Sequence, residues 1–179
     1  MNKIAKFEKV SYEQFKADWV KAFADSFDPE AFDDFESNII ECYNNITLPK
    51  RSTVGSAGFD MFLPFNITLQ PNEFQVIPTG IRCKIDDGWM LACFPRSGHG
   101  FKYGVHLANT VGIIDADYYH ADNEGHIQIK LVNDSVLTKT ISLEPNTAFC
   151  QGIFLPYGIT VDDDADGKRV GGFGSTDKK

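Results

Sequence analysis

Long hydrophobic runs are missing from this chain of 179 residues, and cysteine is scarce. No stretch approaches the roughly 20 consecutive apolar residues of a membrane helix. No basic and then apolar leader precedes the first predicted element, so we expect a cytoplasmic protein without a membrane partner. The cysteines are scattered, mostly within apolar runs: Cys42, Cys83, Cys93 and Cys150. This distribution is typical of reduced, buried thiols and argues against a disulfide framework or a zinc site.

Basic residues are also in the minority. Lysine and arginine number 17 against 25 aspartates and glutamates, which gives a net charge of −8. Because phosphate polymers favour a basic surface, we expect no nucleic-acid partner. The charge does not exclude a small triphosphate, which a few local donors can hold. The sequence has no P-loop pattern and no histidine pair with the spacing of metal ligands.

The chain does have enough apolar residues for a core, with 42% hydrophobic residues and 15 phenylalanines. We expect one domain, or one domain with an appendage. Residues 1–45 differ from the rest in charge, with 10 acidic and 5 basic residues against 15 and 12 in residues 46–179. We interpret them as an acidic, aromatic-rich helical extension.

Two amphipathic helices are predicted in this extension, over residues 11–25 and 29–44. Ser11 and Gln14 match a capping box, and Asp28-Pro29 is a second helix start. Large apolar side chains then recur at helical spacing: Tyr12, Phe15, Trp19, Phe23, Phe32, Phe35, Ile39 and Tyr43. We expect these stripes to pack on each other and on the following domain, and the alternative is a partner-binding surface.

From Ile46 onward the pattern changes to short segments with a period of two, separated by Gly, Pro and Asn. The candidate strands are 58–62, 74–78, 80–86, 89–94, 105–114, 126–133, 136–142 and 149–161. Two Leu-x-Pro-Asn turns, ending at Asn72 and Asn146, interrupt them. Many short strands without alternating helices predict an all-β sandwich or barrel of jelly-roll type over residues 46–161. Residues 162–179, acidic and then glycine-rich, are predicted to be a flexible tail.

One short stretch could carry chemistry. Asp115 ends the apolar run of Gly112-Ile113-Ile114, and Tyr118 follows three residues later. A carboxylate at a strand exit can activate a water, and a ring beside it can hold a sugar. Alone, an acid at a strand end is more often a turn residue. Asp117 is interpreted as structural.

Another candidate is Pro95-Arg96-Ser97-Gly98, which follows an apolar strand. Its backbone N–H groups, the Ser97 hydroxyl and the Arg96 guanidinium could converge on phosphate oxygens. Read in isolation, this stretch is a tight turn with an exposed arginine.

Together with Ala57-Gly58-Phe59-Asp60, Gln151 and Gly171-Gly172-Phe173-Gly174-Ser175-Thr176, these stretches form an ordered set. The set resembles the trimeric dUTP pyrophosphatase (dUTPase) family, and in particular bacterial or phage members with an N-terminal extension. The resemblance covers roughly residues 46–176. It implies a jelly-roll-like distorted barrel, a homotrimer that shares its sites between subunits, and Mg²⁺-assisted hydrolysis of dUTP to dUMP and pyrophosphate. Such an activity limits the incorporation of uracil into DNA.

The resemblance also implies roles for residues near the base and sugar. Asp115 is the acid that activates the attacking water. Tyr118 lies under the deoxyribose, where a 2′-hydroxyl would collide with its ring. Asn109 contacts uracil together with backbone groups of a hairpin.

Further roles concern the phosphates and the metal. Ser97 and Gly98 contact the α- and β-phosphates, while Arg96 touches phosphate or braces Asp60. Asp60 helps to position Mg²⁺ through water, and the ion is held mainly by the triphosphate. Gln151 reaches a phosphate or a metal-bound water.

The resemblance makes residues 162–179 a lid that closes over the substrate. The lid cation is Lys168 or Arg169, and we favour Arg169 for its bidentate fork. Phe173 covers the uracil, and Ser175 and Thr176 bring hydroxyls to the phosphates.

The sequence departs from the family pattern in three places. Residues 119–124 are inserted before Gly125 and are predicted to form a polar surface loop. Ala148 stands where a basic residue is frequent, and His99 where a small apolar residue is usual, and we give His99 no role. Two alternative functions are deamination of dCTP on the same fold and a regulatory protein that binds a partner through residues 1–45 or 119–124.

Overall fold

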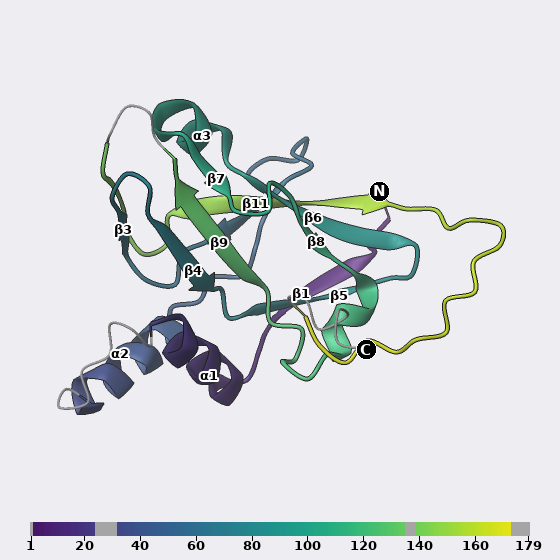
Figure 1. Ribbon diagram of the computed structural model, residues 1–179, viewed down its shortest axis with the longest axis horizontal. Coiled ribbons are helices and arrows are strands. Elements are labelled where there is room, and N and C mark those ends of the chain that lie inside the picture. Colours follow the sequence, from purple (N-terminus) through teal and green to yellow (C-terminus); the bar gives the residue numbers. More distant parts are fainter. Residues whose placement is uncertain (1, 24–31, 135–138, 173–179) are drawn as a thin grey trace.

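A computed structural model describes residues 2–23, 32–134 and 139–172 of the chain. Two helices, α1 (Tyr12–Ala22) and α2 (Phe32–Asn44), lie against one side of a body built from short strands (Figure 1). A third helix, α3 (Ser97–Tyr103), and a 3₁₀ helix, η3 (Ala116–His120), interrupt the strands. Within these residues no helix is long and apolar enough to cross a membrane.

The strands pair in antiparallel fashion into several small sheets. Their bounds are β1 Ala5–Lys9, β2 Phe59–Phe62, β3 Ile67–Leu69, β4 Phe74–Pro78, β5 Ile81–Ile85, β6 Trp89–Pro95, β7 Val105–Leu107, β8 Gly112–Ile114, β9 Gln128–Asn133, β10 Ile141–Leu143 and β11 Ala148–Pro156. The sheet orders are β2-β11-β6-β8, β4-β9-β7, β1-β5 and β10-β3. The first of these four sheets positions most of the residues singled out from the sequence.

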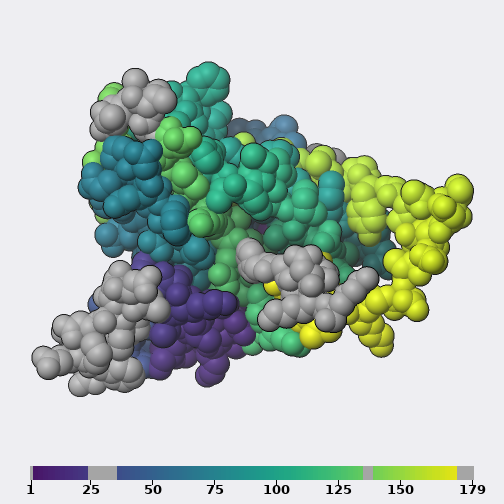
Figure 2. Space-filling view, in the orientation of Figure 1, coloured from purple at the N-terminus to yellow at the C-terminus, as the bar shows by residue number. Residues whose placement is uncertain are grey.

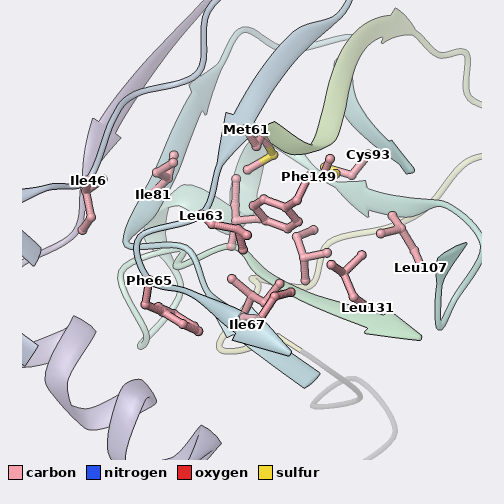
Figure 3. Packing of buried hydrophobic residues seen from close by; sticks show 14 of the residues in the cluster. Ile46, Met61, Leu63, Phe65, Ile67, Ile81, Cys93, Leu107, Leu131 and Phe149 are labelled. Carbon is pink, nitrogen blue, oxygen red and sulfur yellow. The ribbon is translucent and has the colours of Figure 1, made fainter. Parts of the chain in front are cut away.

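One hydrophobic core lies between the sheets and extends to the helices. Figure 3 shows Met61, Leu63 and Phe149 meeting side chains from the opposite sheet, among them Leu107 and Leu131. The same cluster includes residues of α1 and α2: Phe15, Trp19 and Ile39. The helices therefore complete the core instead of standing apart from it. The boundary at residue 45 remains a prediction about domain organisation.

The two predicted N-terminal helices are confirmed for the described residues. Ser11 caps α1 as expected, because its Oγ accepts the Gln14 N–H at 3.1 Å. Trp19 packs edge-on against Phe65 of the β-domain with ring centroids 4.4 Å apart, and Phe15 contacts Tyr43 of α2. These contacts confirm that the described aromatic residues pack on each other and on the domain. The second helix start, Asp28-Pro29, lies outside the described residues.

The turns and the thiols agree with the sequence as well. Asn72 and Asn146 both have left-handed backbones, with φ of 68° and 62°, as their Pro-Asn turns require. All four cysteines are free, and Cys42 is only partly buried.

The expected jelly-roll-like distorted barrel is confirmed as a body of antiparallel sheets, but in the part of the chain described hydrogen bonds join the strands into separate sheets and not into a closed barrel. Turn residues interrupt the pairing. The strand expected over 105–114 is broken at Thr110, whose φ is 62°, and its halves β7 and β8 enter different sheets. A register shift between Ala148 and Cys150 bends β11. Strands β1 and β3 were not predicted at all.

We predict that the extension contributes directly to stability. Phe15→Ala removes a fully buried ring and should lower the free energy of unfolding by about 3–5 kcal/mol. Val20→Ala, on the exposed face of the same helix, should change it by less than about 0.5 kcal/mol. Urea unfolding of both variants measures the difference. Equal effects would show that α1 does not share the core.

Candidate active site

Asp115 stands where β8 ends and η3 begins. Its backbone is extended, and its side chain makes no capping bond to η3. The carboxylate is therefore available to other groups, and 48% of it is exposed. One turn later the Tyr118 ring is buried, at 4% exposure. The structure thus brings together the acid and the ring expected from the sequence.

Arg169 of the C-terminal segment lies across both of them. Its Nη1 donates to Asp115 Oδ2 at 2.6 Å and lies 3.2 Å from Asp117 Oδ1. Its guanidinium carbon is 4.9 Å from the centre of the Tyr118 ring. Asp117, interpreted from the sequence as structural, is therefore a second partner of this arginine. Lys168 is exposed.

A cavity of about 360 Å³ opens beside this pair. Six of its lining residues are Asn109, Gly112, Ile113, Tyr118, Arg169 and Gly172. Gly172 lies directly on the aromatic ring, since a Cβ at this position would be 2.6 Å from Tyr118 Cε2. The volume is in the range of pockets that hold small organic ligands. The cavity therefore has an aromatic floor, an amide and a cation, and that cation, Arg169, is paired with the Asp115 carboxylate.

A second cluster contains Asp60, Arg96 and Gln151. Asp60 Oδ1 lies 3.3 Å from Arg96 Nε, and its Oδ2 accepts the Ser52 hydroxyl at 2.7 Å. Of the two roles expected for Arg96, the structure shows the contact with Asp60. Gln151 of β11 is paired in register with Asp60 of β2 and donates to the Pro95 carbonyl at 3.4 Å.

Ser97 and Gly98 begin α3, immediately after Arg96. The first turn of a helix leaves backbone N–H groups without an intrahelical acceptor. Space around Gly98 is open, because a Cβ there would meet no atom within 4 Å. These groups are therefore accessible to an anion. His99 is different, because burial lowers the pKa of its imidazole below the ordinary value, and we still assign it no role.

The two clusters lie at opposite ends of strand β6. Ile114 pairs with Leu91 near the start of β6, so Asp115 stands beside Met90. Arg96 follows the last residue of the same strand. Six residues at about 3.3 Å each separate these ends by about 20 Å. Figure 1 shows α3 and the 3₁₀ helix that follows β8 at opposite ends of the strands. One chain does not bring the two clusters together.

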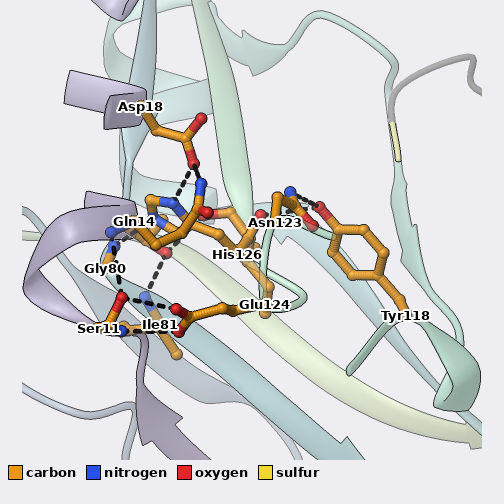
Figure 4. Close-up of polar contacts among 11 residues, drawn as sticks. Ser11, Gln14, Asp18, Gly80, Ile81, Tyr118, Asn123, Glu124 and His126 are labelled. Atoms are coloured by element: carbon orange, nitrogen blue, oxygen red, sulfur yellow. Dashed lines mark hydrogen bonds and ion pairs between the residues drawn. The ribbon is translucent and has the colours of Figure 1, made fainter. Parts of the chain in front are cut away.

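Behind Tyr118 lies a buried polar network (Figure 4). The Tyr118 hydroxyl donates to the His126 carbonyl at 2.9 Å and accepts from Asn123 Nδ2 at 2.8 Å. His126 Nε2 accepts the Gly80 N–H at 2.8 Å, so the ring carries its proton on Nδ1. His126 Nδ1 therefore donates to Asp18 Oδ2 of helix α1, with 2.6 Å between the two atoms.

Both ionisable ends of this network have shifted pKa values. Burial raises the pKa of Tyr118, and the bond from Asn123 offsets part of that effect. Burial also raises the pKa of Asp18, but hydrogen bonds from His126 and Gln14 outweigh it and hold that pKa below its ordinary value. Asp18 is therefore a carboxylate paired with a neutral imidazole. Sequence reasoning missed this network, although an acid on the apolar face of a predicted helix was a signal for it.

Three of the expected site residues follow Gly172 in the chain. Phe173, Ser175 and Thr176 lie outside the described residues. In the described ranges, no group of three or more His, Cys, Asp or Glu side chains could hold a metal ion.

Comparison with known proteins identifies the family. The dUTPase family model matches residues 44–177. The deoxyuridine 5′-triphosphate nucleotidohydrolase of Lactococcus lactis is 37% identical over 143 residues, which cover 77% of this chain and 94% of that protein.

Solved structures agree with that match. The Streptococcus mutans dUTPase has a TM-score of 0.58 and 35% identity, over 65% of this chain and 90% of its own. A mutant dUTPase from phage phi11 of S. aureus, described with a structural Mg(II) ion, has a TM-score of 0.56 and 20% identity. The match covers 69% of this chain and 92% of the phage protein. The latter shows a common fold.

The contact between Arg169 and Asp115 should hold the C-terminal segment in place. The Asp122 N–H donates to the Val170 carbonyl at 2.9 Å and reports on this docking. We expect Arg169→Gln to speed hydrogen exchange of the Asp122 amide by about threefold to tenfold. This factor corresponds to the free energy of local opening that a partly exposed ion pair contributes. Lys168→Gln, at the exposed neighbouring position, should leave the rate unchanged. Unaltered exchange in Arg169→Gln would contradict the docking.

Proposed function

Because the chain belongs to the dUTPase family, we infer that it hydrolyses dUTP to dUMP and pyrophosphate, as a dUTP diphosphatase. By removing dUTP, this activity limits the incorporation of uracil into DNA. The observation that carries the assignment of the site is the position of Asp115 at the edge of a nucleoside-sized cavity floored by Tyr118.

The chemical step falls to Asp115. Its carboxylate orients a water in line with the pyrophosphate leaving group and accepts one of its protons. The water oxygen bonds to the α-phosphorus while the bond from that phosphorus to the bridging oxygen breaks, and the electron pair leaves with pyrophosphate. Arg169 donates a hydrogen bond to the Asp115 carboxylate. A triphosphate, with more negative charge, would draw the guanidinium away and leave Asp115 free to act.

Selection of the nucleoside falls to the cavity. Tyr118 packs under the deoxyribose and leaves no room for a 2′-hydroxyl. Asn109 and neighbouring backbone groups hydrogen-bond uracil, and cytosine would leave mismatched pairs. The lining position of Asn109 and the burial of Tyr118 support these roles.

The phosphate chain would lie against the second cluster. Ser97 and Gly98 supply N–H groups and a hydroxyl, and Gln151 supplies an amide. Residues 162–179 would act as a lid: Arg169 or Lys168 brings a cation, Phe173 covers the base, and Ser175 and Thr176 add hydroxyls.

Mg²⁺ suits this arrangement as an ion held by the substrate. Asp60 already accepts a hydrogen bond from Ser52 and pairs with Arg96, so it fits a role through an intervening water. Mg²⁺ keeps several waters and binds phosphates together with few carboxylates. When bound, it would neutralise charge on the phosphate oxygens. The structural Mg(II) ion of the phage phi11 relative concerns that protein.

The separation of the two clusters supports a homotrimer with shared sites. About 20 Å between Asp115 and Arg96 exceeds the reach of one triphosphate from its α-phosphorus. If a second subunit supplies the Arg96 cluster, a complete site forms at the interface. Three such sites close under cyclic symmetry.

Removing the acid should abolish turnover and spare binding. Asp115→Asn should lower kcat with dUTP by a factor on the order of 10² or more, because the amide cannot accept the proton. Pyrophosphate release measures turnover, and calorimetry with a non-hydrolysable analogue measures binding. UTP, dTTP and dCTP should react far more slowly than dUTP in the wild-type protein. Release of ammonia from dCTP instead would favour a deaminase.

Mixed oligomers test whether sites are shared. We expect Asp115→Asn and an Arg96→Ala/Ser97→Ala variant each to be inactive alone. Co-expressed in equal amounts, they should recover roughly a quarter of the sites, because a site is intact when each chain supplies its undamaged cluster. Sites formed within single chains would recover nothing.

A further inference from the structure

The insert at residues 119–124 and the N-terminal extension are attached to each other. The Glu124 carboxylate accepts the Ser11 N–H at 2.8 Å and the Ser11 hydroxyl at 2.6 Å. At the other end of the insert, the Tyr119 hydroxyl donates to Glu8 at 2.6 Å. The Arg82 guanidinium covers the Tyr119 ring at 4.5 Å from its centre. The insert is thus fixed at both ends by bonds that involve β1, β5 and the cap of α1.

Between these two ends, Asn123 reaches Tyr118. A phenol has one proton, and Tyr118 donates it to the His126 carbonyl. The hydroxyl can therefore only accept from Asn123, which places the amide nitrogen towards Tyr118 at 2.8 Å. Among the residues that the structure describes, the buried Asn123 Oδ1 has no partner. The bond to Tyr118 is thus what sets the orientation of this amide.

The backbone of the insert closes on the same residue. Glu124 and Gly125 both have positive φ, at 57° and 68°, which turns the chain back towards η3. A Cβ at Gly125 would lie 2.6 Å from the Tyr118 carbonyl oxygen. The close approach requires glycine and brings the Asn123 side chain beside the phenol.

We propose that Asn123 is a positioning residue that lets Tyr118 discriminate between deoxyribose and ribose. Its amide fixes the phenol, and the extension fixes the insert that carries the amide. The inference rests on the role proposed above for Tyr118 as the floor under the sugar. Steric exclusion of one oxygen atom requires a wall that does not shift by about 1 Å. Two hydrogen bonds on the Tyr118 hydroxyl hold the ring in place. With only one of them, the ring could pivot about the remaining bond.

The ratio of kcat/KM for dUTP to kcat/KM for UTP tests the proposal. Asn123→Ala should lower this ratio by about fivefold to tenfold, the effect of one lost hydrogen bond. The change should come mainly from faster reaction of UTP. Asn123→Asp keeps the shape but has no proton to donate at neutral pH, so it should lower the ratio as much. Asp122→Asn, at an exposed neighbouring side chain, should leave the ratio unchanged.

A double variant separates positioning from general loosening. Tyr118→Phe keeps the ring and removes the hydroxyl, and it should itself lower the ratio. In that background Asn123→Ala should have no further effect, because the bond is already absent. An equal further loss would show that Asn123 acts by another route and would overturn the proposal. If Asn123→Ala does not fold, as judged by thermal unfolding, the isosteric Asn123→Asp carries the same comparison.

Tyr118→Ala distinguishes failure of this inference from failure of the role on which it rests. An unchanged ratio in Tyr118→Ala would remove the sugar-selecting role of the ring, and the present proposal with it. A collapsed ratio in Tyr118→Ala together with wild-type ratios in Asn123→Ala and Asn123→Asp would overturn the positioning role of Asn123 alone.

Discussion

A buried phenol must keep its hydrogen bonds, and much of this structure is arranged around that requirement for Tyr118. Its hydroxyl is removed from water, and this burial costs free energy unless the hydroxyl both donates and accepts a hydrogen bond. The His126 carbonyl takes the proton and the Asn123 amide supplies one. His126 is held in turn by Asp18 of α1 and by the Gly80 N–H. The first helix, a buried histidine and the insert therefore share one polar network under the ring.

A second constraint is the antiparallel register of the sheet β2-β11-β6-β8. Because β8 pairs with the start of β6, the acid that follows β8 cannot lie near the arginine that follows β6. The register gathers Asp60 and Gln151 at one end and leaves Asp115 at the other. The proposed phosphate-binding residues and the proposed catalytic acid are thereby placed at opposite ends of one strand. The proposed sharing of sites between subunits would bring one of each together.

The sequence predicted what local pattern controls and missed what tertiary contacts decide. Ser11 as a cap and Asn72 as a left-handed turn residue need only their neighbours, and both were predicted correctly. Strand β1 was not recognised, because five residues with two lysines and a glutamate form a strand only when β5 offers its edge. The break at Thr110 escaped detection because threonine rarely adopts a positive φ. The many short strands predicted a sandwich or barrel but not which strands pair, because no local pattern specifies those pairings.

The same distinction applies to the N-terminal extension and to the insert at residues 119–124. The extension and the insert are far apart in the sequence, and each alone reads as a dispensable addition. The family model begins at residue 44 and therefore excludes the helix that carries Asp18. Yet Glu124 of the insert completes the cap of that helix, and Asp18 of the helix completes the partner set of His126. Glu124 and Tyr119 of the insert also bond directly to Ser11 and Glu8 of the extension, so losing one addition would weaken the other. Two independent surface additions would not be coupled in this way, and both contribute to the network around Tyr118, the ring next to the proposed catalytic Asp115.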